Sequence, residues 1–253
     1  MNIIVCAKQV VDVSEMKIDS STKKPILEGI PQKISDIDKN AMEEAIKIKE
    51  KHGGKITVLT VGTSDAKERI KELLAMGADE GVLVLAPEKY DYHIVASLLA
   101  EAVKKIGEYD LILCGEASID MFSGQIGPQL AGFLNIPQIT YAQKIDADKD
   151  KLVADRNMGD KTVTTESSYP VLVTVTKEIN EPRLPSLMQI LAAANKPINE
   201  WTADSLITGV KPVVETIDLK GVPMERKNIV FKDDIDESVK QLVDSLAKEG
   251  LLR

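Results

Sequence analysis

Short apolar runs alternate with helical patterns through the first 140 residues. The apolar runs cover residues 2–7, 56–61, 82–85 and 111–114, and amphipathic helical patterns begin near Asp36 or Asp38, after Ser64, near 93 and at Gln125. Strands that alternate with helices of this length favour a parallel sheet with helices on both faces. We therefore expect an α/β fold with a doubly wound, Rossmann-like parallel sheet.

Three loops follow these predicted strands, and in a parallel sheet the carboxyl ends of the strands lie at one edge, so the loops meet there. Ligands of such sheets bind at this edge. The three loops are residues 7–9, 62–64 and 115–127. In the third, a polar loop with Ser118, Asp120 and Ser123 leads into the helix that starts at Gln125. The free N–H groups of a helix N-terminus attract phosphates, so we expect an adenine nucleotide here.

The pattern changes after residue 145. Residues 146–169 mix charged and β-branched residues, as in antiparallel strands, and 171–176 form a buried strand before a proline-punctuated loop. Periodicity is then poor until a terminal helix near 236–248. A long weakly patterned segment is unusual inside a compact domain. We expect a nucleotide-binding domain over 1–195 and an extended C-terminal arm over 196–253 that lies on another chain.

Composition narrows the function. The net charge is -8 and no basic stripe is present, which argues against nucleic-acid binding. No apolar run reaches the roughly 20 residues of a membrane span, and the N-terminus lacks a signal-peptide pattern, so we expect a cytoplasmic protein. Cys6 and Cys114 are expected to be buried thiols. No nucleophile–base pair or metal motif is evident, so a bound cofactor would supply any chemistry.

Four segments together resemble the β subunit of electron transfer flavoproteins. They are the opening VCAKQVVD, NAMEEAIKIKE with ELLAMGADE downstream, GEASID with GQIGPQLAGFLNIPQIT, and VTKEINEPRLPSL. The alternative from the residues alone, a stand-alone universal-stress-like nucleotide-binding protein, predicts a glycine-rich phosphate loop that the sequence lacks. The resemblance implies a heterodimer with an α subunit that carries FAD. It also implies electron exchange with acyl-CoA or other flavin dehydrogenases and with a quinone oxidoreductase.

The resemblance implies an AMP or FAD site at the same edge of the sheet. The residues that it assigns to this site are Cys6, Ala7, Lys8, Ser35, Asp38, Asn40, Val61, Gly62, Thr63, Ser64, Ser118, Ile119, Asp120, Gly124, Gln125, Ile126 and Gly127. Members with AMP carry a threonine at the position of Ile126, whereas members that bifurcate electrons from NADH carry an aliphatic residue and bind FAD. Gly124 leaves space for a diphosphate. These positions favour FAD slightly, although Met121 and Phe122 match neither branch.

The loop from 180 to 187 corresponds to the loop with which the family docks its partner dehydrogenases. Leu187 matches the anchoring leucine, and the resemblance places Glu181 and Arg183 near the subunit interface. An apolar side chain on a proline-stiffened loop loses little entropy when it docks. The alternative from the residues alone is that Leu187 is an ordinary core leucine at the start of a helix.

Overall fold

A computed structural model describes residues 1–86, 90–209, 212–221 and 227–252 of the chain. The chain divides into two compact units. The first comprises Met1–Lys17 and Ile26–Asp218, and the second comprises Ile18–Pro25 and Leu219–Arg253. The first unit contains the sheet and all of the residues expected at the nucleotide site.

Among the described residues, the first unit contains a nine-stranded sheet in the order β11-β10-β9-β12-β8-β1-β6-β7-β13. Its strands are β1 (Asn2–Cys6), β6 (Lys55–Gly62), β7 (Glu80–Leu85), β8 (Leu111–Gly115), β9 (Gln138–Ala147), β10 (Lys151–Asn157), β11 (Thr162–Ser168), β12 (Val171–Val175) and β13 (Ile198–Thr202). In this spatial order, every neighbouring pair in the run β9-β12-β8-β1-β6-β7-β13 is parallel. The pairs β9–β10 and β10–β11 are antiparallel. The expected α/β fold with a doubly wound sheet is confirmed.

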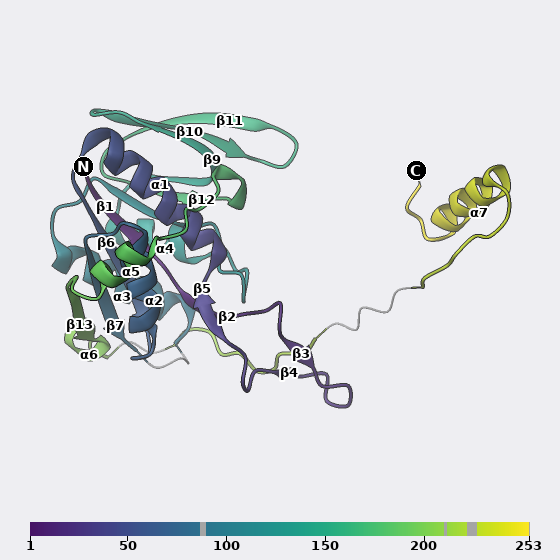
Figure 1. Ribbon diagram of the computed structural model, residues 1–253, viewed down its shortest axis with the longest axis horizontal. Coiled ribbons are helices and arrows are strands. Elements are labelled where there is room, and N and C mark those ends of the chain that lie inside the picture. The colour runs from purple at the N-terminus through teal and green to yellow at the C-terminus, as the bar shows by residue number, and fades with distance from the viewer. Residues whose placement is uncertain (87–89, 210–211, 222–226, 253) are drawn as a thin grey trace. The chain divides into compact units, whose positions relative to one another are not determined.

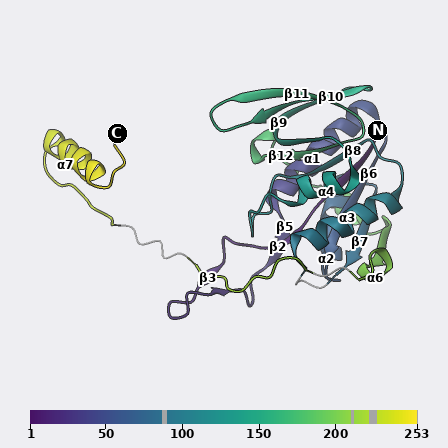
Figure 2. The same cartoon turned by 180° about the vertical axis from the view of Figure 1, so that it is seen from behind.

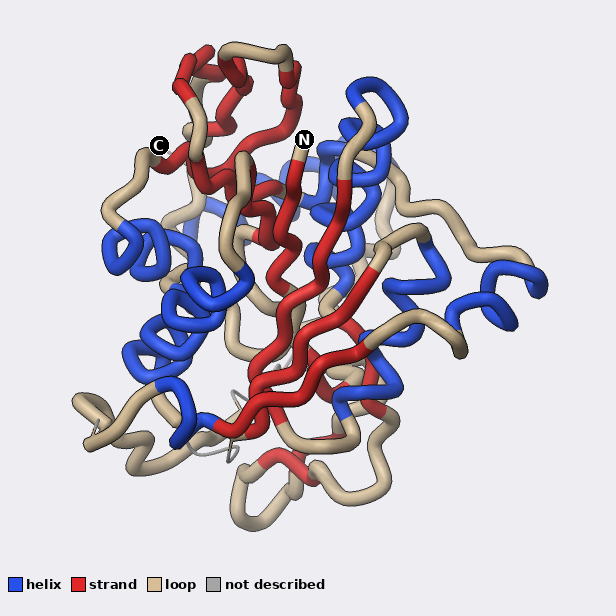
Figure 3. The backbone as a smooth tube through the Cα atoms, turned by 90° about the vertical axis from the view of Figure 1, so that its left-hand side faces the viewer, coloured by secondary structure: helices blue, strands red, loops and turns tan. Residues whose placement is uncertain are grey.

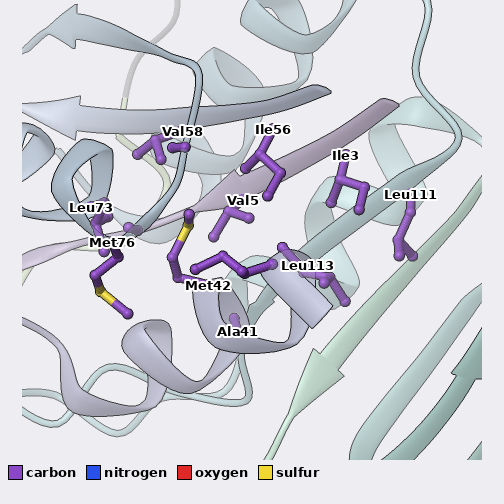
Figure 4. Packing of buried hydrophobic residues seen from close by; sticks show 14 of the residues in the cluster. Ile3, Val5, Ala41, Met42, Ile56, Val58, Leu73, Met76, Leu111 and Leu113 are labelled. Atoms are coloured by element: carbon purple, nitrogen blue, oxygen red, sulfur yellow. The ribbon is translucent and has the colours of Figure 1, made fainter. Parts of the chain in front are cut away.

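Helices cover both faces of this sheet (Figures 2 and 3). They are α1 (Asp36–His52), α2 (Ala66–Met76), α3 (Tyr92–Ile106), α4 (Ile126–Leu134), α5 (Leu187–Ala193) and α6 (Ala203–Leu206). Successive residues of β1 point to opposite faces: Ile3 and Val5 join the core under α1 and α2, whereas Ile4 and Cys6 join the core under α3 and α4. Figure 4 shows the first of these cores around Met42 of α1.

Three local expectations change. Residues 198–202, assigned to the arm, form β13 and pair in parallel with β7. The helix expected directly after Ser64 begins one residue later, at Ala66, with Asp65 as its N-cap residue. The antiparallel region begins slightly earlier than residue 146, because β9 pairs antiparallel with β10 from Ala142 onward.

The remaining elements are small. The polar excursion over 13–34 contains β3 (Lys17–Ile18) paired with β4 (Pro25–Ile26), and β2 (Gln9–Val11) pairs antiparallel with β5 (Gln32–Ile34). The second unit contains α7 (Ile235–Lys248; Figure 1). Its N-cap residue Asp234 accepts a hydrogen bond from the N–H of Glu237. Its apolar residues Val239, Leu242 and Val243 are exposed. The predicted arm also includes 210–211, 222–226 and 253, which lie outside the described residues.

Candidate functional site

The direction of chain progression reverses between β1 and β8. From β1 the chain adds β6 and β7 on one side, then crosses over to add β8 and β12 on the other. In open α/β sheets, ligands bind at this reversal, beyond the carboxyl ends of the strands. Lys8 follows β1 here, and Gly115 ends β8.

Asp38 of α1 joins the two strands at this reversal. Its Oδ2 accepts a hydrogen bond from the N–H of Lys8 at 2.9 Å, and its Oδ1 accepts one from the N–H of Gly115 at 3.0 Å. A Cβ at position 115 would lie 2.7 Å from Asp38 Oδ1, so this approach requires glycine. Asp38 therefore positions the backbone of both loops from inside the protein.

Burial also changes the proton affinity of Asp38. Its side chain is buried, and desolvation raises its pKa to about 7, against the opposing effects of the two backbone N–H groups and of Lys8. Burial similarly raises the pKa of the Cys6 thiol to about 12, so Cys6 is a poor nucleophile. Ala7 is buried beside it.

A charged cluster lies at the reversal between β1 and β8. Lys8 Nζ donates to both carboxylate oxygens of Asp120, at 2.9 and 2.7 Å, and to Ser118 Oγ at 3.5 Å. The Lys8 side chain is 43% exposed. Behind the cluster, the buried Ser35 Oγ accepts a hydrogen bond from the N–H of Ile119 at 3.3 Å, which ties the loop to the start of α1. The structure thus brings Lys8, Ser118 and Asp120 together.

The loop after β6 joins the same edge through side-chain contacts. Asp65 accepts hydrogen bonds from Thr63 Oγ1 and from Gln9 Nε2, and these bonds lower its pKa. Gln9 follows β1, so Asp65 links the loops after β1 and β6. Three further expected residues lie at the end of β6 or in the loop after it and are not part of these side-chain contacts: Val61, Gly62 and Ser64.

The start of α4 supplies backbone donors. The first N–H groups of a helix have no intrahelical partner, so those at Gln125 and Ile126 are available to an anion. Gln125 is the N-cap residue, and its Oε1 accepts a hydrogen bond from Gln129 Nε2 at 3.0 Å. Gly127 has a packing role, because a Cβ there would lie 2.4 Å from Thr174 Cγ2 of β12. Gly124 has a positive φ of 65° in the approach to the helix.

Asn40 is separated from this cluster. Its Nδ2 donates to the carbonyl oxygen of Asn180 at 2.7 Å and to that of Lys177 at 3.3 Å. Asn180 Nδ2 in turn donates to the carbonyl oxygen of Asn40 at 3.0 Å. The side chain that the resemblance places at the nucleotide instead holds the loop after β12 against α1.

The same loop is clamped further along α1 by Arg183. Its Nε and Nη2 each lie 2.9 Å from a carboxylate oxygen of Glu43, and its Nη1 donates to Glu50 at 2.6 Å. Arg183 therefore lowers the pKa of Glu50 through a hydrogen bond. Glu43 is buried and the Arg183 side chain is 35% exposed, so only the carboxylate side of this ion pair is shielded from water. Glu181 lies in the same loop, and its side chain forms no hydrogen bond or ion pair with the described residues.

An exposed apolar surface follows the clamp. Ser186 caps α5, accepting from the N–H of Gln189, while Gln189 Oε1 accepts from the N–H of Ser186. We call the exposed apolar residues here the docking surface: Leu184, Leu187, Met188, Ile190 and Leu191. Leu187 is 71% exposed, so it is not a core leucine. The other residues of this surface are not predictable from the sequence, because apolar residues at this spacing are typical of the buried face of a short helix.

These features define a class of protein: an α/β fold with a doubly wound sheet and an exposed apolar loop after its last central strand. Among the described residues, no helix is both long and apolar enough to cross a membrane. The family model of the electron transfer flavoprotein domain matches residues 25–206.

Curated relatives match over nearly the whole chain. The electron transfer flavoprotein subunit beta of Thermoanaerobacterium thermosaccharolyticum is 41% identical, covering 97% of this chain and 98% of the relative. That of Bacillus subtilis is 35% identical over 99% of both chains. The caffeyl-CoA reductase-Etf complex subunit CarD of Acetobacterium woodii is 38% identical over 84% of this chain and 81% of that subunit. The chain belongs to the electron transfer flavoprotein family, as a β subunit.

Proposed function

We propose that this β subunit holds an adenine nucleotide at the reversal between β1 and β8 and that it pairs with an FAD-bearing α subunit. The observation that carries the proposal is the cluster of Lys8, Ser118 and Asp120 beside the N-terminus of α4. A lysine ammonium and free helix N–H groups are suited to phosphate oxygens. The carboxylate of Asp120 is suited to ribose hydroxyls, which donate hydrogen bonds.

The docking surface is the proposed contact for partner dehydrogenases. Arg183 and Asn180 fix its loop on α1, so its apolar side chains are held in place before a partner arrives. A prearranged surface loses less entropy on binding than a mobile one. Electrons would then pass between the docked partner and the FAD of the α subunit.

The exposed apolar residues of α7 support an arm that packs on the α subunit. An amphipathic helix whose apolar residues stay exposed requires another surface to bury them. Val239, Leu242 and Val243 lie three and four residues apart, on one side of α7, and are 45–53% exposed. Helix α7 belongs to the second compact unit, whereas the sheet belongs to the first.

We favour FAD over AMP in the β site. Gly124 has left-handed backbone geometry and leaves the loop without a side chain where a diphosphate would pass. Ile126 offers no hydroxyl to a single phosphate, and the backbone of α4 supplies the donors instead. With FAD bound, the subunit could accept a hydride from NADH, which is the reaction of the bifurcating branch.

Counting the cofactors of the purified heterodimer tests the proposal. The chain is coexpressed with its α subunit, and the released nucleotides are separated and identified by mass spectrometry. Two FAD molecules per heterodimer are expected. One FAD with one AMP would keep the electron-transfer role but contradict FAD in the β site. A colourless, stable homodimer without nucleotide would contradict the proposal as a whole.

A further inference from the structure

The first turn of α1 lies between the two regions to which functions are proposed. Asp38 and Asn40 are both buried in this turn, and residues two apart on a helix point about 200° from each other. Asp38 accepts hydrogen bonds from the loops after β1 and β8, which we call the nucleotide loops. Asn40 donates instead to the docking loop, which we define as residues 176–186 between β12 and α5. One helical turn thus contacts both regions.

The nucleotide loops are fixed to this turn through their backbones. Asp38 accepts from the N–H groups of Lys8 and Gly115 at 2.9 and 3.0 Å. The N–H of Ser35 donates to the carbonyl oxygen of Lys8 at 3.0 Å, and Ser35 Oγ accepts from the N–H of Ile119 at 3.3 Å. Both backbone polar groups of Lys8 are therefore bonded to the start of α1. A ligand that immobilises Lys8 also immobilises this turn.

The docking loop is fixed to the same turn by a reciprocal pair of asparagines. Asn40 Nδ2 donates to the carbonyl oxygens of Asn180 and Lys177, at 2.7 and 3.3 Å. Asn180 Nδ2 donates in return to the carbonyl oxygen of Asn40 at 3.0 Å and to Glu44 Oε2 at 3.1 Å. The Arg183 clamp holds the second half of the loop, so the asparagine pair determines where the first half lies.

The first turn of α1 depends on these contacts for its own order. Ser35 is the N-cap residue, but its hydroxyl accepts no hydrogen bond from the helix and accepts one from Ile119 of a nucleotide loop instead. A helix end without a side-chain cap is less stable than a capped one. Order that a ligand supplies from one side of the turn no longer has to be supplied from the other, and this couples two sites even without a change of shape.

We propose that Asn40 is a positioning residue through which an adenine nucleotide, bound at the reversal between β1 and β8, tightens the attachment of the docking loop to α1. This inference rests on the proposed function. The nucleotide immobilises the nucleotide loops, these loops order the first turn of α1, and Asn40 then restricts the docking loop. Because coupling between binding sites is reciprocal, a partner on the docking surface strengthens nucleotide binding by the same factor.

Hydrogen–deuterium exchange of the full-length chain tests the inference, because exchange rates report local opening. The chain is freed of bound nucleotide, and AMP binding is measured by calorimetric titration. Saturating AMP should slow exchange over 177–186 by about fivefold, the lower end of typical coupling between sites. Exchange over 115–127 should also become slower. Exchange over 158–168, in the hairpin at the other edge of the sheet, should not change.

Asn40→Ala separates the coupling from nucleotide binding. The variant should still be saturated by AMP, because the Asn40 side chain donates to the docking loop and not to the nucleotide loops. Exchange over 177–186 should be faster than in the wild-type chain and equal with and without AMP. Asn180→Ala removes the other half of the pair and should give the same result, which keeps the test available if Asn40→Ala does not fold. The matched control is Asn199→Ala, at an exposed position of β13, which should keep the full response to AMP.

Three outcomes would contradict different parts of the argument. If AMP binds and slows exchange over 115–127 but not over 177–186, the inference is overturned and the proposed nucleotide site stands. A full response to AMP in a folded Asn40→Ala or Asn180→Ala variant would also overturn it, because the asparagine pair would then not carry the coupling. Failure of AMP to bind the wild-type chain in the titration would contradict the proposed function itself.

Discussion

Helix α1 carries two buried carboxylates that are held in different ways. Near the N-terminus, Asp38 accepts hydrogen bonds from two neutral backbone N–H groups. About one and a half turns further along the helix, Glu43 is equally buried, but it forms a bidentate ion pair with Arg183. One carboxylate positions the loops of the candidate nucleotide site, and the other fixes the candidate docking loop.

This difference shows what each region is built to do. The cation near Asp38 is Lys8, which does not pair with the Asp38 carboxylate. Its side chain is partly exposed, and its ammonium contacts Asp120. A cation and helix N–H groups remain near the surface, where a phosphate can reach them. Around Glu43, by contrast, the guanidinium of Arg183 is committed to Glu43 and Glu50. We therefore expect changes there to affect stability first, and changes at Lys8 to affect binding first.

The largest effect is expected from Arg183→Met. This change leaves the Glu43 carboxylate buried and unpaired, which should lower the free energy of unfolding by about 3 kcal/mol. Urea unfolding measures it. The double variant Glu43→Gln/Arg183→Met should recover part of the loss, because the unpaired charge is removed.

A matched control separates burial from charge. Lys51→Met breaks the Lys51–Asp146 pair, whose side chains are 59% and 70% exposed. Its effect should stay below about 1 kcal/mol. Equal losses for Arg183→Met and Lys51→Met would show that the Arg183 clamp does not differ from a surface ion pair.

The pH dependence of stability tests the raised pKa of the buried Asp38 carboxyl. The folded-state pKa of Asp38 is about 7 against an ordinary value of 3.8, so the folded chain binds a proton that the unfolded chain releases between these values. This contribution is present at low pH and is lost as the pH rises toward 7. Each pKa unit corresponds to about 1.4 kcal/mol, so the loss between pH 5 and 7 should be about 2 kcal/mol.

Asp38→Asn cannot titrate and supplies the comparison. Its absolute stability should be lower, because an amide NH₂ cannot accept the second N–H. Its slope between pH 5 and 7 should nevertheless be flatter than that of the wild-type chain, measured by urea unfolding at each pH. Parallel slopes would mean that Asp38 titrates at its ordinary value.

Leu187→Ala should affect docking without affecting the fold. The side chain is 71% exposed and contributes little to the core. An anchor at the centre of an interface typically contributes 1–2 kcal/mol or more, so the KM for a partner flavin dehydrogenase should rise about tenfold. Met158→Ser, at an exposed position in the β10–β11 turn, is the control. An unchanged KM in Leu187→Ala would remove Leu187 from the docking surface.

The central strands could be predicted from the sequence because both of their faces are buried. Leu111, Ile112 and Leu113 all lie in the core, so the apolar run alone marks β8. Strand β13 could not be predicted in this way, because Asn199 and Glu200 are exposed at the edge of the sheet and interrupt the apolar pattern. Its pairing with β7 depends on a partner more than 100 residues away.

The site was predicted in part for the same reason. A buried strand marks where the following loop begins, so the sequence predicts that Lys8, Ser118 and Asp120 lie at the same edge of the sheet. Asn40 was placed beside Asp38, yet residues two apart on a helix point about 200° from each other. Helical geometry therefore directs Asn40 to Asn180.

The smallest expected effect comes from Lys8→Met. Because the Lys8–Asp120 pair is partly exposed, its loss should lower stability by less than about 1 kcal/mol. The affinity for AMP should fall about fivefold at low salt, since the lysine supplies a charge-assisted hydrogen bond to phosphate. Salt should reduce this difference by screening. Adenosine, which has no phosphate, should bind the wild-type chain and the variant equally when both are titrated calorimetrically. An equal loss for adenosine would show that Lys8 shapes the loop and does not contact phosphate, so the cluster around Lys8 would then resemble the Arg183 clamp.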